Sequence, residues 1–171
     1  MVHSLDPLTW LPTRGGFESC LARAVRNIGR TRSVLALLAI DLDHLDGVNA
    51  ALGHEFGDRI VREAAARMAR ALAPDAVLAR LESDDFAAFL EVRNLAHAAN
   101  QAALVLERCR EPYVIDCLAV TATASIGIAL CASAAEDTAS LMARAERALV
   151  EAKIRGRDGF YPGAATLRSE P

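Results

Sequence analysis

Two short acidic segments carry the side chains best suited to chemistry. Glu82, Asp84 and Asp85 fall within four residues of one another, between two apolar runs of strand length. Asp41 and Asp43 follow another apolar run, and their spacing places both on one face at the end of a strand. Carboxylates crowded together are unfavourable unless a cation or solvent relieves their charge. We therefore predict a divalent-metal site, because hard cations prefer oxygen ligands. The alternatives are a solvated turn and a simple strand end.

A group of polar residues between these segments could recognise a purine base. Asn49 and Asp58 lie around two glycines, Gly53 and Gly57, which mark tight backbone geometry. An asparagine amide and an aspartate carboxylate together complement guanine, which offers an acceptor at O6 and donors at N1 and N2. Asp58 could equally cap the helix that follows it. The residues alone leave both interpretations open.

Two basic residues near the C-terminus could bind phosphate. Lys153 and Arg157 lie at the end of the last predicted helix and just beyond it. Basic side chains form charge-assisted hydrogen bonds with phosphate oxygens. The same charges would also complement the dipole at a helix C-terminus, so these two roles stay open as well.

The hydrophobic pattern predicts the elements that position these side chains. Residues 34–40 are apolar on both faces, as in a central strand buried on two sides. Residues 120–129 alternate, which predicts a strand with one buried and one more polar face. Further strands are expected at 76–81, 86–90 and 113–117, and helices between Thr13 and Gly29, over 60–72, from Asn94 to Cys109 and from about 137 to 156.

The composition is typical of one folded domain. The chain has 171 residues, of which 53% are hydrophobic, enough for a sizeable core. Mixed helices and strands around one sheet predict an α/β or α+β sandwich. The net charge of −3 gives no electrostatic reason to bind nucleic acid, and the longest apolar run, 34–40, is too short to span a bilayer. The four cysteines lack metal-site spacing and are expected to be reduced thiols in a cytoplasmic protein.

Several short motifs follow one another in a recognisable order. They are Asp6-Pro7-Leu8-Thr9, Leu11-Pro12 with Arg14, Asp41-Leu42-Asp43-His44, Asn49 with Gly53-His54 and Gly57-Asp58, Asp84-Asp85-Phe86, Ser125-Ile126-Gly127-Ile128-Ala129 and Ala152-Lys153-Ile154-Arg155-Gly156-Arg157. In this order they resemble the GGDEF family, the diguanylate cyclase domains of bacterial signalling. The resemblance implies a GGDEF domain over residues 1–161 and a linker-like tail at 162–171. It also implies an α+β fold, with a five-stranded, mostly antiparallel sheet surrounded by helices, as in polymerase palms and nucleotidyl cyclases.

The resemblance further implies a metal-dependent site. Active members of the family condense two GTP into cyclic di-GMP, with one GTP on each subunit of an antiparallel dimer and Mg²⁺ or Mn²⁺ as the cofactor. By position, Asp41, Asp84 and the backbone carbonyl of Leu42 would bind the metal. Asp84 and Asp85 would be the catalytic carboxylates.

The nucleotide contacts follow from the same resemblance. Asn49 and Asp58 would bind guanine. Lys153 and Arg157 would hold the phosphates, and His44 would lie along the phosphate-facing turn.

The acidic turn, residues 82–85 between two predicted strands, departs from the family pattern. Glu82 and Ser83 replace two glycines that let the turn approach the nucleotide in the family. A β-carbon there blocks a close approach or a required positive φ. A carboxylate about 5 Å from a phosphate charge would also cost roughly 3 kcal/mol at an effective dielectric near 20.

Other family positions differ too. Asp46 replaces a lysine that contacts phosphate, Asp85 replaces a longer glutamate, and Trp10 replaces a glycine. The Arg-x-x-Asp motif that binds inhibitory product is missing, because its two positions are Ala73 and Ala76.

We therefore predict a degenerate GGDEF domain that acts as a regulatory or dimerisation module in bacterial cyclic di-GMP signalling. It is expected to be catalytically inactive and to bind GTP or another guanine nucleotide weakly, with Mg²⁺ or Mn²⁺. We expect a fragment of a larger protein that carries a sensor or EAL phosphodiesterase domain, located in the cytoplasm with any membrane anchor elsewhere in the longer chain. Two alternatives stay open: an active or slow diguanylate cyclase, and a ligand-free structural interaction domain.

Overall fold

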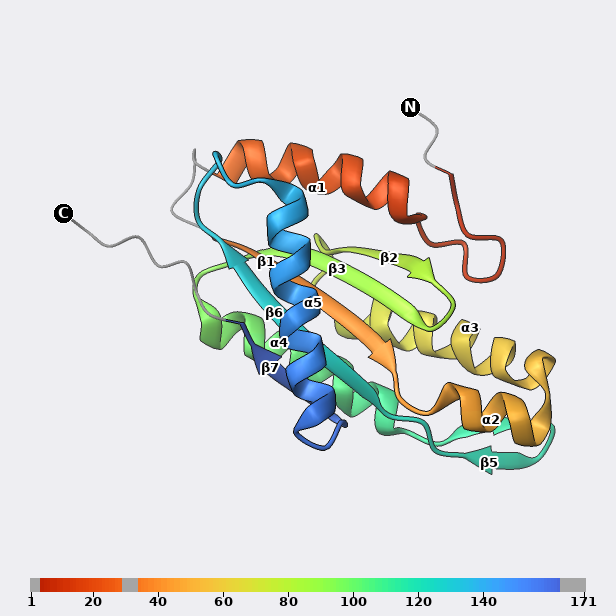
Figure 1. Ribbon diagram of the computed structural model, residues 1–171. Coiled ribbons are helices and arrows are strands. Elements are labelled where there is room, and N and C mark those ends of the chain that lie inside the picture. Colours follow the sequence, from red (N-terminus) through yellow and green to blue (C-terminus); the bar gives the residue numbers. More distant parts are fainter. Residues whose placement is uncertain (1–3, 29–33, 164–171) are drawn as a thin grey trace.

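The computed structural model describes residues 4–28 and 34–163, which form a central sheet with helices on both faces (Figure 1). The strand order is β2-β3-β1-β6-β7, and neighbouring strands are antiparallel except for the parallel pair β6 and β7. The predicted α+β fold with a five-stranded, mostly antiparallel sheet is confirmed. The strands are β1 (Val34–Leu42), β2 (Val77–Glu82), β3 (Asp85–Val92), β6 (Ala124–Cys131) and β7 (Gly159–Pro162).

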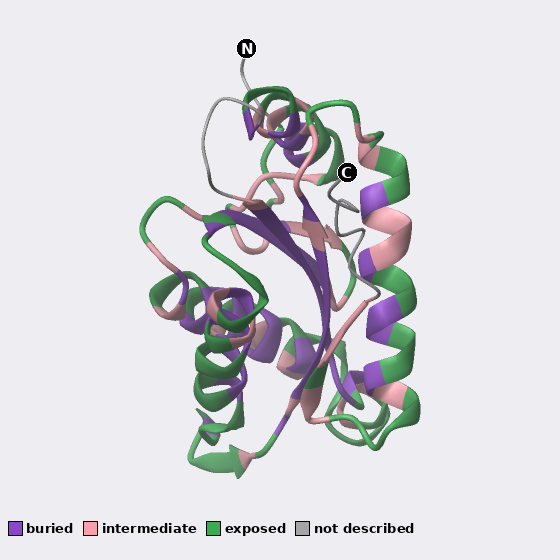
Figure 2. Cartoon of the chain, turned by 90° about the vertical axis from the view of Figure 1, so that its left-hand side faces the viewer, coloured by how far each residue is buried: buried purple, intermediate pink, exposed green. Residues whose placement is uncertain are grey.

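β1 occupies the centre of the sheet because both of its faces are apolar. Leu38 and Ile40 belong to one buried cluster, and Leu35 and Leu37 belong to another on the opposite face. Figure 2 shows the buried strands between helices on both sides. The strand extends beyond the predicted range to Leu42, so Asp41 lies within it.

Within the described residues, five helices surround the sheet: α1 (Arg14–Ile28), α2 (Leu45–Leu52), α3 (His54–Ala71), α4 (Leu95–Arg110) and α5 (Thr138–Ile154). Helices α3 and α4 supply the cluster on one face, and α1 and α5 supply the other. The predicted helix start at Asn94 agrees with the structure, because Asn94 caps α4 by accepting a hydrogen bond from the His97 N–H. The predicted stop of α1 at Gly29 lies outside the described residues. No helix in the described part is long and apolar enough to cross a membrane.

The predicted strand over 120–129 is wrong in two respects. It is divided into β5 (Leu118–Val120), which pairs with β4 (Tyr113–Ile115), and β6, which begins at Ala124. β6 is also buried on both faces, because helices pack on each side. Ser125 is buried and bonds to a carboxylate, and a Cβ at Gly127 would lie 2.1 Å from the Ala145 carbonyl oxygen of α5. The polar-looking face therefore holds a close helix contact and a buried hydrogen bond.

The strand β7 was not predicted. It pairs with β6 through Ser125 to Ile128, and the Gly163 N–H donates to the Ile128 carbonyl at 2.8 Å. Pro162 and Gly163, the first two residues of the predicted tail, therefore continue the sheet. Residues 164–171 lie outside the described residues, so the linker remains a prediction.

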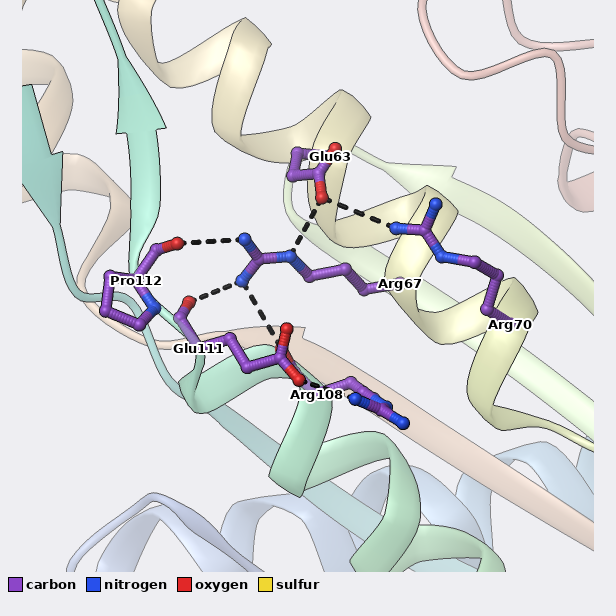
Figure 3. Close-up of polar contacts among 6 residues, drawn as sticks. All are labelled: Glu63, Arg67, Arg70, Arg108, Glu111 and Pro112. Atoms are coloured by element: carbon purple, nitrogen blue, oxygen red, sulfur yellow. Dashed lines mark hydrogen bonds and ion pairs between the residues drawn. The ribbon is translucent and has the colours of Figure 1, made fainter. Parts of the chain in front are cut away.

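A buried arginine joins α3 to the connection between α4 and β4 (Figure 3). Arg67 donates to the backbone carbonyls of Arg108, Glu111 and Pro112, and its Nε lies 2.9 Å from Glu63. Its guanidinium carbon lies 4.1 Å from the centre of the Tyr113 ring. The carbonyls at a helix end lack partners within the helix, so Arg67 stabilises the C-terminus of α4.

All four cysteines lie in the described part of the chain, and none forms a disulfide there. Cys109 and Cys131 are buried, and burial raises the pKa of each thiol to about 11. These two thiols therefore stay protonated at neutral pH and pack as small apolar groups.

Candidate metal and nucleotide site

Three carboxylates meet where β1 and β3 lie side by side. Asp41 of β1 is the cross-strand partner of Asp85 of β3, and Asp84 immediately precedes β3 in the turn. One oxygen from each carboxylate lies within 4.8 Å of the other two. The Leu42 N–H donates to the Asp84 carbonyl at 3.3 Å and ties the turn to β1. The predicted grouping of Asp41, Asp84 and Asp85 is confirmed, and we call these residues the acidic cluster.

The acidic cluster has the electrostatics of a cation site. Burial raises the pKa of Asp41 to about 6. Its bond to Lys153 opposes this rise, and the neighbouring Asp84 and Asp85 add to it. A divalent ion would relieve this repulsion, and carboxylate oxygens at this spacing suit Mg²⁺ or Mn²⁺. The residues present therefore fit the metal that the family implies. The Leu42 carbonyl as a further ligand remains a prediction.

Asp43 does not join the acidic cluster, so its assignment to a metal site is wrong. Its side chain is fully buried and accepts hydrogen bonds from Thr123 Oγ1 at 2.6 Å, Ser125 Oγ at 2.7 Å and the Asp158 N–H at 3.1 Å. The carboxylate faces β6 and the segment after α5, where donors already satisfy it. It has a structural role in joining these three parts of the chain.

The two basic residues at the C-terminal end of α5 reach the same end of the sheet as the acidic cluster. The Lys153 Nζ lies 2.7 Å from Asp41 Oδ2, and the Arg157 Nε lies 3.9 Å from Asp43 Oδ1. Arg157 lies beyond α5 in left-handed backbone, with φ of 62°. Both cations thus stand beside Asp41 and Asp43 at the end of β1, and their contact with phosphate remains a prediction.

The predicted guanine residues lie on two helices that pack together, Asn49 on α2 and Asp58 on α3. Asn49 Oδ1 is buried and has no hydrogen-bond partner among the described residues. A Cβ at Gly57 would lie 1.8 Å from this oxygen, so only glycine leaves room for the Asn49 side chain against α3. Asp58 is the next residue and is exposed. Because α3 begins at His54, Asp58 lies inside the helix and is not its cap. A buried acceptor without a partner is uncommon and favours a ligand site.

His44 lies at the junction between β1 and α2. It precedes α2 with φ of 61°, and its exposed side chain makes no capping bond. Asp46 lies in the first turn of α2. Asp46 therefore puts a negative charge near the helix end at which backbone N–H groups favour anions. The role of His44 along a phosphate-facing turn remains a prediction.

The acidic turn has a strained backbone. Ser83 has φ of 30°, in the region that favours glycine, and Glu82 beside it is exposed. The register between β2 and β3 shifts between Arg80 and Glu82. The turn is therefore held in a shape that a side chain at residue 83 does not favour.

Arg80 supports this turn, and sequence reasoning did not give it a role. Its Nε donates to the Ser83 carbonyl at 2.8 Å, and its Nη1 lies 3.1 Å from Asp6 Oδ1. Asp6 in turn accepts from the N–H and hydroxyl of Thr9. The Asp-Pro-Leu-Thr motif was visible, but its pairing with Arg80 spans 74 residues. Only the fold brings these residues together.

Comparisons with known proteins agree with this architecture. Residues 3–159 match the family described as "Diguanylate cyclase, GGDEF domain". The chain is 36% identical over 155 residues to the bifunctional diguanylate cyclase/cyclic di-GMP phosphodiesterase MucR of Pseudomonas aeruginosa, covering 91% of this chain and 23% of MucR. It is 30% identical over 160 residues to the cyclic di-GMP phosphodiesterase PdeR of Escherichia coli, covering 94% of this chain and 24% of PdeR.

A solved structure shows the same fold. The GGDEF domain of PA1120 (TpbB or YfiN) from Pseudomonas aeruginosa superposes with a TM-score of 0.88 at 32% identity, covering 94% of this chain and 95% of that one. The chain spans about a quarter of the length of MucR and PdeR. Its sequence, fold and acidic cluster together show that it belongs to the GGDEF family of cyclic di-GMP signalling.

Proposed function

We propose that this GGDEF domain binds a guanine nucleotide with Mg²⁺ or Mn²⁺ and acts as a regulatory module without appreciable cyclase activity. The observation that carries the proposal is the contrast at the acidic turn. Asp84 and Asp85 keep the cation cluster, whereas Glu82 and Ser83 stand where the resemblance places the family's glycines. The domain would thus keep its binding groups and lose the close approach that turnover needs.

The binding half of the proposal rests on the acidic cluster and on Asn49. Asp41, Asp84 and Asp85 would hold the ion, which neutralises phosphate charge when it is bound. The unpartnered Asn49 Oδ1 would accept a hydrogen bond from the base, and Asp58 would accept another.

The proposed lack of cyclase activity rests on charge and geometry. The Glu82 carboxylate would face a triphosphate, at a cost of roughly 3 kcal/mol for unit charges about 5 Å apart and an effective dielectric near 20. Asp85 is one methylene shorter than the family's glutamate, and small displacements of a catalytic carboxylate lower rates strongly. Asp46 would add a further negative charge near the phosphates.

Isothermal titration with GTP and Mg²⁺ tests the binding half. We expect weak saturable binding that falls about tenfold in Asn49→Ala, the equivalent of one hydrogen bond to the base. Asn27→Ala is the matched control, because Asn27 is exposed on α1. Absence of binding at millimolar GTP would reduce the domain to the ligand-free interaction module.

A cyclase assay tests the inactive half. Concentrated protein with GTP and Mn²⁺ should give no cyclic di-GMP by mass spectrometry, and the double variant Glu82→Gly, Ser83→Gly should bind GTP more tightly. The intact acidic cluster favours one rival, an active or slow diguanylate cyclase. Product from the wild-type chain that disappears in Asp84→Ala would establish that rival.

The same proposal includes the longer protein to which the domain would belong. MucR and PdeR are named for phosphodiesterase activity and are about four times as long as the match. We infer a longer protein in which this domain regulates a neighbouring EAL or sensor domain in the cytoplasm, alone or as a homodimer. Fusing it to its native neighbour and measuring phosphodiesterase rate with and without GTP tests the inference.

A further inference from the structure

Lys153 is the only lysine among the 19 lysine and arginine residues of the chain. Its ammonium lies 2.7 Å from Asp41 Oδ2, and its side chain is 32% exposed, against 12% for Asp41. The lysine thus reaches from the end of α5 to a carboxylate near the end of β1, and a metal ion would need that carboxylate.

Lys153 partly neutralises the negative charge of the acidic cluster. Asp41, Asp84 and Asp85 place three carboxylates within 4.8 Å, and the ammonium compensates one of them. A divalent cation bound through Asp41 would stand beside the ammonium in a partly buried setting, where like charges repel strongly. The ammonium therefore opposes the entry of a cation that arrives alone.

We propose that Lys153 is a tethered counter-ion that makes cation binding depend on a phosphate-bearing ligand. It stabilises the acidic cluster while no divalent ion is bound. When cation and nucleotide arrive together, the ammonium moves from Asp41 to a phosphate oxygen. This inference rests on the proposed nucleotide site and adds to it a coupling between its two ligands.

The chemistry of lysine suits this movement. Its ammonium is a point charge on a flexible four-carbon stem with three donors, so it can exchange one oxygen partner for another. An arginine is a planar fork that favours a fixed bidentate partner. The position of Lys153 in the last turn of α5 fixes the base of the stem, and its side chain is partly exposed to solvent.

The test measures Mn²⁺ binding without nucleotide, from the free-Mn²⁺ signal in electron paramagnetic resonance. Lys153→Met should bind Mn²⁺ at least tenfold more tightly than the wild type, because the competing charge is gone. The same variant should bind GTP with Mg²⁺ at least tenfold more weakly, because the phosphate partner is gone. Arg147→Met is the matched control: it removes the same charge from an exposed position about 9 Å along α5 and should change neither affinity.

The outcomes separate the counter-ion from the nucleotide site. Equal Mn²⁺ affinity in the wild type and Lys153→Met would overturn the proposal. Tighter Mn²⁺ binding in the variant with no GTP binding to either protein would support the counter-ion, overturn its transfer to phosphate and refute the proposed function. Tighter Mn²⁺ binding with unchanged GTP affinity would overturn the transfer alone.

A second measurement uses the wild-type chain and does not depend on the variant folding. Reductive ¹³C-dimethylation labels Lys153 and the N-terminal amine, which keep their charges and give separate resonances. The Lys153 resonance should move with Mg²⁺ and GTP together, at a Mg²⁺ concentration that leaves it in place when added alone. A full shift with Mg²⁺ alone would contradict the coupling.

Discussion

Asp41 and Asp43 stand two residues apart at the end of the same strand, and their carboxylates lie in opposite surroundings. Asp41 faces two other carboxylates and one ammonium, and burial among them raises its pKa to about 6. Asp43 faces three hydrogen-bond donors from β6, the loop before it and the segment after α5. Identical residues in one short motif thus divide into one that favours a cation and one that holds the fold together.

The difference lies in which groups the rest of the chain supplies. A buried carboxylate surrounded by donors is satisfied, and its removal leaves those donors unpaired. A carboxylate surrounded by other carboxylates is unfavourable until a cation is bound. The comparison therefore predicts opposite effects on stability when each aspartate is changed.

The largest effect is expected for Asp43→Ala. Removing the carboxylate leaves Ser125 Oγ buried without its acceptor, and it leaves Thr123 Oγ1 and the Asp158 N–H partly buried without theirs. The free energy of unfolding should fall by about 3 kcal/mol or more, as for other broken buried polar networks. Urea denaturation measures it. A loss no larger than that of Asp41→Ala would erase the distinction.

Cation binding should show the reverse order. Asp41→Asn should lower Mn²⁺ affinity about a hundredfold, equivalent to about 2.7 kcal/mol, because one charged ligand is lost. Asp43→Asn should bind Mn²⁺ like the wild type, provided that circular dichroism shows a folded chain. Isothermal titration checks both, and weaker Mn²⁺ binding in folded Asp43→Asn would place Asp43 in the metal site after all.

The pH dependence of stability distinguishes Asp41 more finely. Its pKa is raised from an ordinary 3.8 to about 6, so between these values the folded state holds a proton that the unfolded state has lost. Stability contributed by Asp41 therefore falls as pH rises from about 4 to 6 and stays low above 6. In EDTA, Asp41→Asn should gain about 2 kcal/mol over the wild type at pH 7.5 and nothing at pH 3.5. Thermal or urea unfolding across this range measures the gain, and a variant less stable than the wild type at pH 7.5 would contradict it.

The smallest effect concerns Asp6. Its surroundings are intermediate between those of Asp41 and those of Asp43. Burial would raise its pKa, but hydrogen bonds from Thr9 and Arg80 outweigh burial and hold the pKa below its ordinary value. Its contribution to stability is therefore present above pH 3.8 and is lost as pH falls through the lower folded pKa. Asp6→Asn should cost about 1 kcal/mol at pH 7, and this cost should shrink below pH 3.8. Acid titration of unfolding checks this, with Asp75→Asn as the exposed control.

Local pattern sufficed for much of the fold and part of the site. The apolar run of β1, the hairpin of β2 and β3 and the capping residue of α4 follow from neighbours in the sequence, so periodicity and propensity predict them. The resemblance placed Asp41, Asp84 and Asp85 together, and the cross-strand pair of Asp41 with Asp85 confirms this. The break between β5 and β6 and the strand β7 escaped prediction, because contacts with distant elements determine them.

Residue types at short spacing were enough to predict the family, the central strand and the acidic residues of the turn. The contacts of Asp43 with its three donors, of Lys153 with Asp41 and of Arg80 with Asp6 could be seen only once the chain was folded. Those contacts join residues 74 to 115 positions apart. The physical reason is that a charged side chain takes its role from the partners that folding brings to it, and no local spacing specifies those partners.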